Sequence, residues 1–193
     1  MKKILFWLLP VALFSCEKTV YSPNPADDTY SLQQITYEAG DKGKMETFVR
    51  PLHSLTYFNN TSVVQQVVVD PLADVMETSL FISDDERAFT LLEGMVPSVA
   101  VPMTLTEGVV TVGAAKWPYR SETAQLPPTL NFRDTIAVPP NRRLTLLMNV
   151  YFNELELAYT ATFEGRPTGT ITEVKGRWKG VAVAHVEKQI EFH

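Results

Sequence analysis

The sequence predicts an all-β protein built on an elongated antiparallel sheet or sandwich with long strands. Short runs rich in valine, threonine, tyrosine and phenylalanine recur from Ser31 onward, with turn residues between them. No stretch combines helix-capping residues with a sustained apolar period of 3.6 residues. The longest alternating runs lie in the C-terminal half, and long strands favour an extended architecture over a compact barrel.

Turn residues divide the chain into the expected strands. The strands predicted in the first half cover 32–38, 45–50, 54–58, 62–70 and 75–83. Residues 73–80 would also fit a short helix, but their β-branched flanks favour a strand. The strands predicted in the second half cover 142–153, 156–164, 170–178 and 181–192, with a break at Asn153-Glu154.

The run 170–178 shows the clearest alternation. Its apolar and small side chains fall on one face, and its charged side chains fall on the other. The first set is Thr172, Val174, Gly176 and Trp178, and the second is Glu173, Lys175, Arg177 and Lys179. Because side chains alternate between the faces of a strand, we expect the first set to be buried and the second to face water.

The first residues predict export and lipidation. Two lysines precede an apolar stretch over 4–14, which is shorter than the ~20 residues that span a bilayer and suits the core of a signal peptide. Leu13-Phe14-Ser15-Cys16 resembles the lipobox at which bacterial lipoproteins are cut. We therefore expect a signal peptide over 1–15 and a lipid on Cys16.

The alternative is an ordinary secretory signal that ends near a chance cysteine. Cys16 is the only cysteine of the chain, and an exported protein rarely keeps one free thiol. A lipid on Cys16 explains why the chain has this single cysteine and why an exported protein would not be left with a free thiol. Glu17 follows the cysteine where an aspartate would favour retention in the inner membrane, so we expect the outer membrane, on either of its faces.

The remainder divides into a tether and one domain. Residues 16–30 are polar and contain two prolines, which is typical of a linker. Residues 31–193 are enough for a single domain with a core. The formal net charge is −5 and no basic patch stands out, so nucleic acid is not an expected partner.

The segment 98–117 predicts an amphipathic β-hairpin around a Glu107-Gly108 turn. Folding the chain there pairs side chains into an apolar face and a more polar one. The apolar pairs are Leu105 with Val110, Met103 with Val112 and Val101 with Ala114; the others are Thr106 with Val109, Thr104 with Thr111 and Pro102 with Gly113. Each arm has about ten residues, close to the ~9–11 of a transmembrane β-strand. A hairpin lying apolar face down on a soluble core fits the same pattern, and Pro102 weakens a continuous ladder.

Four segments between 57 and 180 resemble, in order and spacing, the aerolysin and epsilon-toxin family of β-pore-forming proteins. The first is Phe58-Asn59-Asn60-Thr61-Ser62, followed by Gln65-Gln66. The second is the hairpin, with Val101-Pro102-Met103 and Glu107-Gly108-Val109. The third is Ile136-Ala137-Val138-Pro139-Pro140. The fourth is Gly176-Arg177-Trp178-Lys179-Gly180.

The resemblance implies an aerolysin-like fold and a ring of protomers that each insert one hairpin into a shared barrel. It assigns the lipid-facing side to Val99, Val101, Met103, Leu105, Val110 and Val112. It assigns the channel side to Thr104, Thr106 and Thr111, and structural roles to Asn59, Asn60, Val138, Pro139, Pro140, Trp178 and Gly180. The alternative is a non-lytic binding or structural lipoprotein that keeps the fold, because a fold does not fix a function.

The sequence predicts no enzyme. It contains no Gly-x-Ser-x-Gly elbow, phosphate-binding glycine loop or zinc spacing. His53, His185 and His193 are scattered, and Asp84-Asp85-Glu86 lacks the spaced oxygens of a calcium loop. We therefore expect no cofactor, metal or small-molecule substrate. The expected partners are a lipid membrane, through acylated Cys16, and further copies of the chain in a ring.

Overall fold

The computed structural model describes residues 24, 28–40 and 43–193. The predicted signal peptide, Cys16 and most of the predicted tether lie outside the described residues, so lipidation stays a prediction. The first strand, β1 (Thr29–Glu38), begins two residues before the expected start of the domain.

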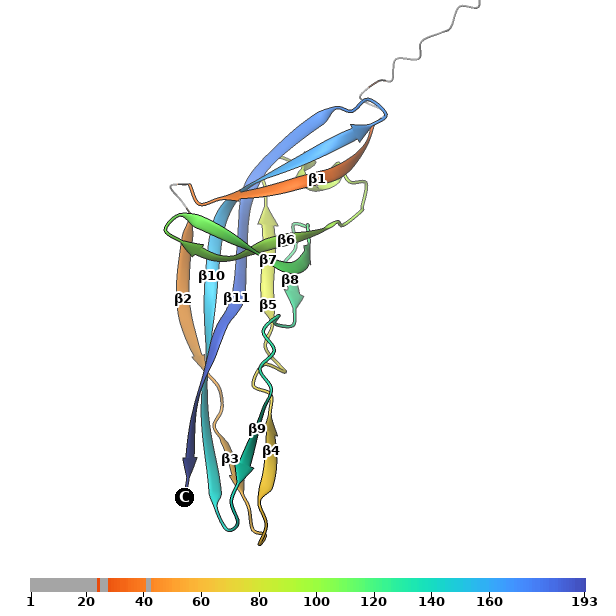
Figure 1. Ribbon diagram of the computed structural model, residues 1–193. Coiled ribbons are helices and arrows are strands. Elements are labelled where there is room, and N and C mark those ends of the chain that lie inside the picture. The colour runs from red at the N-terminus through yellow and green to blue at the C-terminus, as the bar shows by residue number, and fades with distance from the viewer. Residues whose placement is uncertain (1–23, 25–27, 41–42) are drawn as a thin grey trace, which may run out of the picture.

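Two long antiparallel strands run the length of the molecule (Figure 1). They are β10 (Arg143–Arg166, 24 residues) and β11 (Ile171–Phe192, 22 residues). At ~3.4 Å per residue, β10 is roughly 80 Å long. β1, β2 (Lys44–Pro51) and β3 (Leu55–Phe58) pair in turn with β10. β5 (Glu77–Ile82) pairs with β11, and β8 (Ala124–Leu126) pairs with β5 to complete a seven-stranded sheet.

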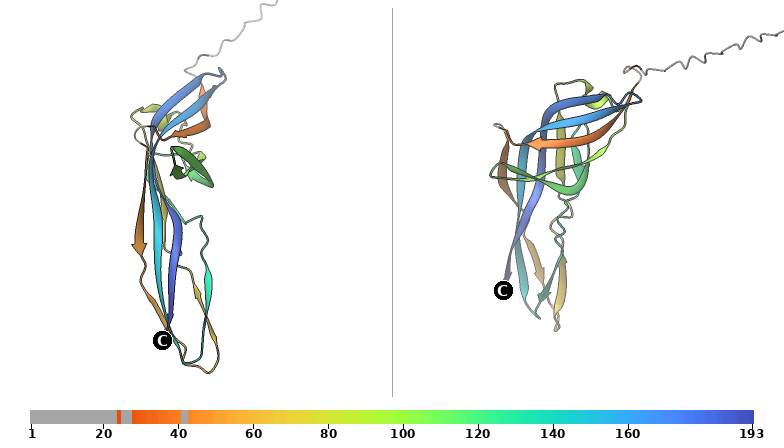
Figure 2. Two further views of the ribbon diagram at one scale, coloured as in Figure 1. Left: turned by 60° about the vertical axis from the view of Figure 1, so that its left-hand side comes forward. Right: turned by 45° about the horizontal axis from the view of Figure 1, so that its top comes forward.

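Two further pairs of strands form sheets of their own. β4 (Gln65–Val69) pairs with β9 (Asp134–Val138) along the lower half, and β6 (Ser98–Thr106) pairs with β7 (Val109–Pro118) across the upper half (Figure 2). The helix α1 (Arg87–Thr90) has four residues. Residues 73–80 form a turn followed by the start of β5 and no helix. The predicted fold class, an elongated antiparallel all-β domain, is confirmed.

The predicted break at Asn153-Glu154 is wrong, because β10 continues through it. Up to Phe152 the even-numbered side chains of β10 are buried, and from Leu155 onward the odd-numbered ones are. The buried face therefore passes to the other side of the strand. In the sequence, the buried positions change from even to odd numbers across the polar residues Asn153 and Glu154. The end of one strand and the start of another would give the same pattern.

Because the buried face changes side along β10, the buried side chains form separate clusters in the upper and lower halves. The upper cluster is the largest and contains the aromatic side chains Phe81, Tyr119, Tyr159, Phe163 and Trp178. Two smaller clusters fill the lower half, one between β10 and the β4–β9 pair and one around Phe152 and Val183.

The predicted alternation over 170–178 is present, although Thr172 and Gly176 are only half-buried. Val174 and Trp178 are buried, and the four charged residues between and beyond them are exposed. Trp178 donates from Nε1 to Ser79 Oγ at 2.8 Å. A Cβ on Gly180 would overlap the six-membered ring of this indole, so glycine is required there to let Trp178 fold over β11.

A single asparagine organises the lower end of the molecule. Asn59 is fully buried, and its side-chain amide donates to the carbonyls of Val63, Val138 and Pro139 at 2.8, 2.9 and 3.1 Å. Its Oδ1 accepts from the Thr61 backbone and hydroxyl. The β3–β4 loop is thus joined to the turn between β9 and β10. Of the residues that the resemblance singled out here, the structure brings together Asn59, Val138 and Pro139, and leaves Asn60 exposed.

Candidate membrane-insertion hairpin

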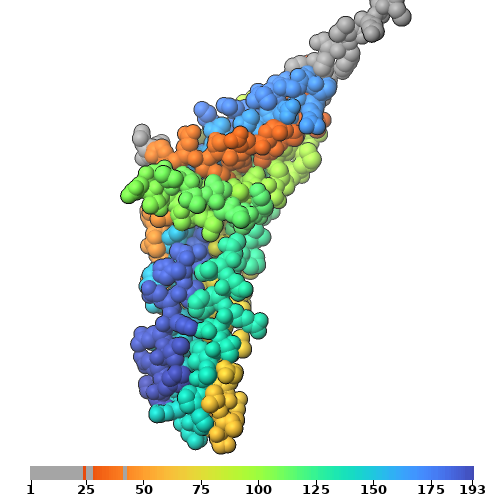
Figure 3. All heavy atoms as spheres, in the orientation of Figure 1, coloured from red at the N-terminus to blue at the C-terminus, as the bar shows by residue number. Residues whose placement is uncertain are grey.

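The β6–β7 hairpin is an excursion from an antiparallel ribbon of two strands. β5 and β8 pair through Glu77 with Leu126, Thr78 with Gln125 and Ser79 with Ala124. The chain leaves this ribbon after β5, forms α1 and the hairpin, and returns to it at β8. The hairpin itself lies across the front of the upper half, on the surface of the molecule (Figure 3).

The predicted turn is present. Glu107 and Gly108 both have positive φ, 52° and 81°, as a two-residue type I′ turn requires. The three pairs next to the turn have the predicted register: Thr106 with Val109, Leu105 with Val110 and Thr104 with Thr111.

Further from the turn the predicted register is wrong. Pro102 lies opposite Val112 instead of Gly113, and Ala100 lies opposite Lys116, with an irregularity on either side of Pro102. The predicted pairs of Met103 with Val112 and Val101 with Ala114 are therefore absent. Proline has no N–H to donate, so the ladder is interrupted where it stands.

This irregularity divides the apolar face. Leu105, Val110 and Val99 pack against the upper core, and Val101 is buried. Val112 is instead 45 % exposed. The predicted pairing of these side chains into one apolar face therefore holds next to the turn and is wrong at Val112.

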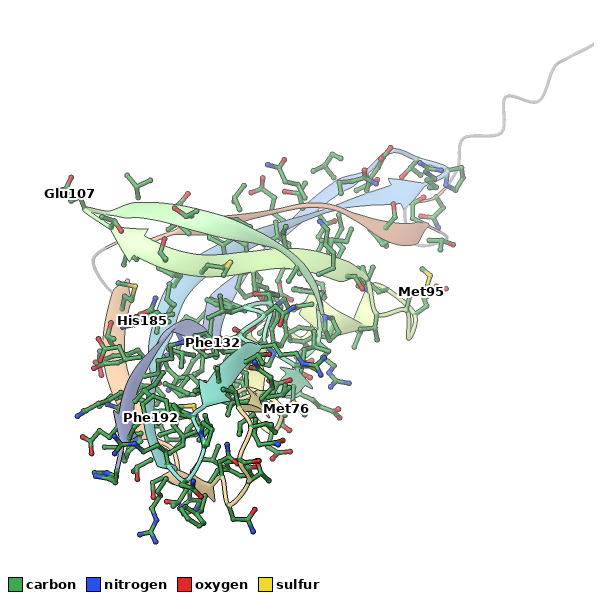
Figure 4. The ribbon with its side chains drawn as sticks, turned by 60° about the horizontal axis from the view of Figure 1, so that its bottom comes forward. Met76, Met95, Glu107, Phe132, His185 and Phe192 are labelled. Carbon is green, nitrogen blue, oxygen red and sulfur yellow. The ribbon has the colours of Figure 1, made fainter. Side chains whose placement is uncertain are left out.

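Burial increases from the tip of the hairpin to its base. The residues from Thr106 to Val109 are exposed, and Figure 4 shows Glu107 projecting from the end of the hairpin. At the base, Val101 and Trp117 are 6 % and 4 % exposed. The tip is thus free of packing, while the base is part of the upper core.

One phenol holds the hairpin to the main sheet. Tyr37 on β1 donates from its hydroxyl to the carbonyl of Ala100 on β6 at 2.9 Å. Burial raises the pKa of Tyr37 far above its usual range, so the phenol stays protonated and remains a donor. A weaker contact joins the Leu105 N–H to Met45 Sδ at 3.5 Å.

We expect Tyr37→Phe to loosen the hairpin. The ring keeps its edge-on contact with Trp178, with centroids 6.0 Å apart, but the hydrogen bond to β6 is lost. Such a bond contributes about 1 kcal/mol, so amide hydrogen exchange in β6 and β7 should speed up about fivefold. Tyr151→Phe is the matched control, because it removes a phenol bond to Glu187 on an exposed face. Equal exchange in both variants would contradict the role of Tyr37.

A small cavity of about 20 Å³ lies beneath the hairpin, enough for roughly one water molecule. Side chains of the hairpin, including Pro102 and Met103, line one wall, and Trp178 and the buried Glu77 lie on the opposite side. Glu77 Oε1 accepts from the Val183 N–H at 2.8 Å. Burial raises the pKa of Glu77, and the backbone bonds from Val183 and Thr129 oppose this rise.

The raised pKa of Glu77 predicts a pH dependence of stability. A carboxyl with a raised folded pKa contributes most when it is protonated in both states, and this contribution is lost as pH rises through the folded pKa. We therefore expect the free energy of unfolding of the native chain to fall, relative to Glu77→Gln, between pH 4 and neutral pH. Urea titrations at several pH values measure this, with the exposed Glu107→Gln as control. Parallel pH profiles for the native chain and Glu77→Gln would contradict it.

The residues singled out from the sequence lie in two places. Trp178 and Gly180 lie under the hairpin, and Asn59, Val138 and Pro139 lie at the lower end. Sequence reasoning missed Tyr37, Met45 and Glu77, which hold or underlie the hairpin. Tyr37 and Met45 come from strands far from the hairpin in the chain, Glu77 comes from the strand that precedes it, and no local pattern marks any of them.

The part of the chain that the structure describes contains no candidate metal centre and no long apolar helix. Among those residues, no group of three His, Cys, Asp or Glu side chains is placed to hold a metal ion. No helix within the described ranges is long and apolar enough to cross a membrane.

Comparison with known proteins gives matches among solved structures. No protein-family model matches the sequence, and no curated protein matches it. The lamprey immune protein superimposes with a TM-score of 0.54 at 16 % identity, over 86 % of this chain and 53 % of that one. An aerolysin-like protein from Bombina maxima (TM-score 0.36, 11 % identity) covers 83 % of this chain and 97 % of its own. The parasporin-2 toxin of Bacillus thuringiensis (TM-score 0.35, 14 % identity) covers 84 % and 73 %.

The chain shares the fold of the lamprey immune protein, and an aerolysin-like protein is among the solved structures that it resembles. This confirms the resemblance stated from the sequence as far as the fold is concerned. The chain spans about half the length of the lamprey immune protein. Within this fold, β6–β7 is the hairpin predicted from the sequence, held by its base and free at its tip.

Proposed function

We propose that this chain is an exported, lipid-anchored protein that assembles into a ring and inserts β6–β7 into a membrane as part of a shared β-barrel. The observation that carries the proposal is the independence of the hairpin. β6 and β7 pair with each other in a sheet separate from the main one. Lifting them away therefore breaks side-chain contacts and the Tyr37 bond, and leaves the ladder of the seven-stranded sheet intact.

The dimensions of the hairpin suit a membrane. β6 has nine residues and β7 has ten, against the ~9–11 that one transmembrane strand needs. Next to the turn, Leu105 and Val110 share one face while Thr104 and Thr111 share the other. One face can meet lipid and the other water, as barrel strands require.

A ring follows from the chemistry of the backbone. A single hairpin in lipid exposes two unpaired edges, and each unsatisfied N–H or C=O there costs several kcal/mol. Only a closed barrel removes the edges. Several copies must therefore each contribute one hairpin.

The predicted lipid on Cys16 supplies membrane attachment in this proposal. Three acyl chains exceed the two signals needed for stable anchoring. The anchor concentrates the domain at a bilayer. The outer membrane is the proposed location, as the residue after Cys16 favours.

The burial of the hairpin base favours a second candidate function. Val101 and Trp117 belong to the upper core, so release of the whole hairpin exposes core side chains. A non-lytic binding or structural lipoprotein would keep this base buried permanently. The two candidates differ in whether the hairpin leaves the sheet.

A reversible crosslink tests the proposal. Met45→Cys with Leu105→Cys, joined by a reducible bismaleimide, ties the tip half of the hairpin to β2, since these two residues are in contact. We expect the full-length acylated chain to release dye from lipid vesicles, the crosslinked chain to release at least tenfold less, and reduction to restore release.

The matched control crosslinks Asn149→Cys to Glu187→Cys, an exposed pair across β10 and β11 that leaves the hairpin free. It should release dye like the unmodified chain. If the unmodified chain causes no leakage and forms no rings in electron micrographs, on neutral and anionic vesicles alike, the pore function is wrong and the non-lytic candidate stands.

A further inference from the structure

The strand directions determine from which end of the molecule a released hairpin would extend. β5 is antiparallel to β11, with Thr78 opposite Val181 and Ile82 opposite Arg177. β5 therefore runs toward the end that carries the turn between β10 and β11, and β8 runs back from it. Residues 83–123 connect these strands at that end. Straightened, they would continue the β5–β8 ribbon beyond the same end.

The N-terminal chain is fixed at this end as well. Asp28 is buried, and its carboxylate accepts the backbone N–H of Thr168 at 3.0 Å and the Thr168 hydroxyl. Thr29 and Tyr30 then pair with Arg166 and Gly165 at the end of β10. The start of β1 accordingly lies beside the β10–β11 turn. The loop between β3 and β4, with the contacts around Asn59 (the Asn59 cluster), lies at the opposite end (Figure 1).

We infer that the hairpin enters the same membrane that holds Cys16. This inference rests on the proposed function and adds the identity of the target: the bilayer that carries the chain's own acyl groups. A released hairpin would leave the domain at the end marked by Thr168, which is also where Asp28, near the C-terminal end of the predicted tether, is held.

Lengths support insertion into the anchoring membrane. The residues from Cys16 to Asp28 span at most roughly 40 Å. A ribbon from Ser83 to Glu107 reaches roughly 80 Å at ~3.3 Å per residue. It can pass the end of the domain and cross a hydrocarbon core of ~30 Å.

Insertion into a facing membrane requires the opposite orientation. The end with the Asn59 cluster would then lie against the anchoring membrane, and the tether would have to run back along the body of the domain. β10 alone is roughly 80 Å long, twice the reach of the tether. The tether is too short for that arrangement.

Two vesicle populations test this inference. The full-length acylated chain is reconstituted into vesicles that hold one dye, and protein-free vesicles of the same lipids hold another. We expect the anchoring vesicles to leak at least tenfold more than the protein-free vesicles. Any leakage caused by the unanchored Cys16→Ser chain should be equal in the two vesicle populations. Leakage confined to the protein-free vesicles would overturn the inference while leaving the pore function in place.

A second readout does not depend on conduction. A polarity-sensitive fluorophore on Leu105→Cys is quenched only when the hairpin reaches brominated lipids. We expect quenching when these lipids are in the anchoring vesicles and none when they are in the protein-free vesicles; the reverse pattern overturns the inference. Quenching by the anchoring vesicles without dye release would support the direction of insertion and contradict pore formation.

Discussion

Val112→Lys is expected to reduce vesicle leakage at least a hundredfold without changing the stability of the soluble domain. Val112 is 45 % exposed, so a lysine there meets water in the folded chain. In the proposed barrel the same position faces lipid near the middle of the membrane. A lysine at the midplane of a barrel costs about 2–4 kcal/mol, and every protomer of a ring carries it.

Thr111→Lys is the matched control for this variant. Thr111 precedes Val112, is also exposed, and belongs to the face assigned to the channel. We expect it to keep leakage within about threefold of the native chain, because a charge on the lumen side changes selectivity more than stability. Equal loss in the two variants, measured as dye release at matched protein concentration, would show that β7 does not alternate between lipid and water.

Asn59→Asp is expected to lower the free energy of unfolding by roughly 3 kcal/mol. The aspartate cannot donate to the carbonyls of Val63, Val138 and Pro139, and a buried acceptor without a donor costs about 1–3 kcal/mol. It also places a carboxyl at a fully buried position among carbonyl oxygens.

Urea unfolding measures this effect, and Asn60→Asp is the control. Asn60 is the exposed neighbour, so its substitution should change stability by less than about 0.5 kcal/mol. Similar unfolding free energies for Asn59→Asp and the native chain would contradict the view that Asn59 joins the β3–β4 loop to the β9–β10 turn.

Local patterns were sufficient for much of the fold. Alternation over 170–178 predicted which side chains of β11 are buried, and Glu107-Gly108 predicted the hairpin turn and the register next to it. These features depend on neighbouring residues and on the preferences of single residue types. Pro102 also signalled an interrupted ladder, although it did not indicate which residues would lie opposite one another beyond it.

Other features depend on contacts between distant residues and were beyond local patterns. The continuity of β10 through Asn153 is decided by its partners β2 and β11, which pair with it on both sides. Tyr37 reaches Ala100 across 63 residues of sequence, and Glu77 reaches Val183 across 106. No alternation in the sequence predicted β8 and β9. Both strands are short, and pairing with their partner strands stabilises them.

A fluorophore scan of β7 tests the central claim, that the hairpin leaves the sheet and enters a bilayer with one face toward lipid. A polarity-sensitive dye is placed on single cysteines at Thr111 and Val112, both of which are exposed in the folded domain. On binding vesicles, the emission at position 112 should shift from that of water to that of hydrocarbon, while position 111 stays in water. Unchanged emission at both positions, or an equal shift at both, would contradict the account.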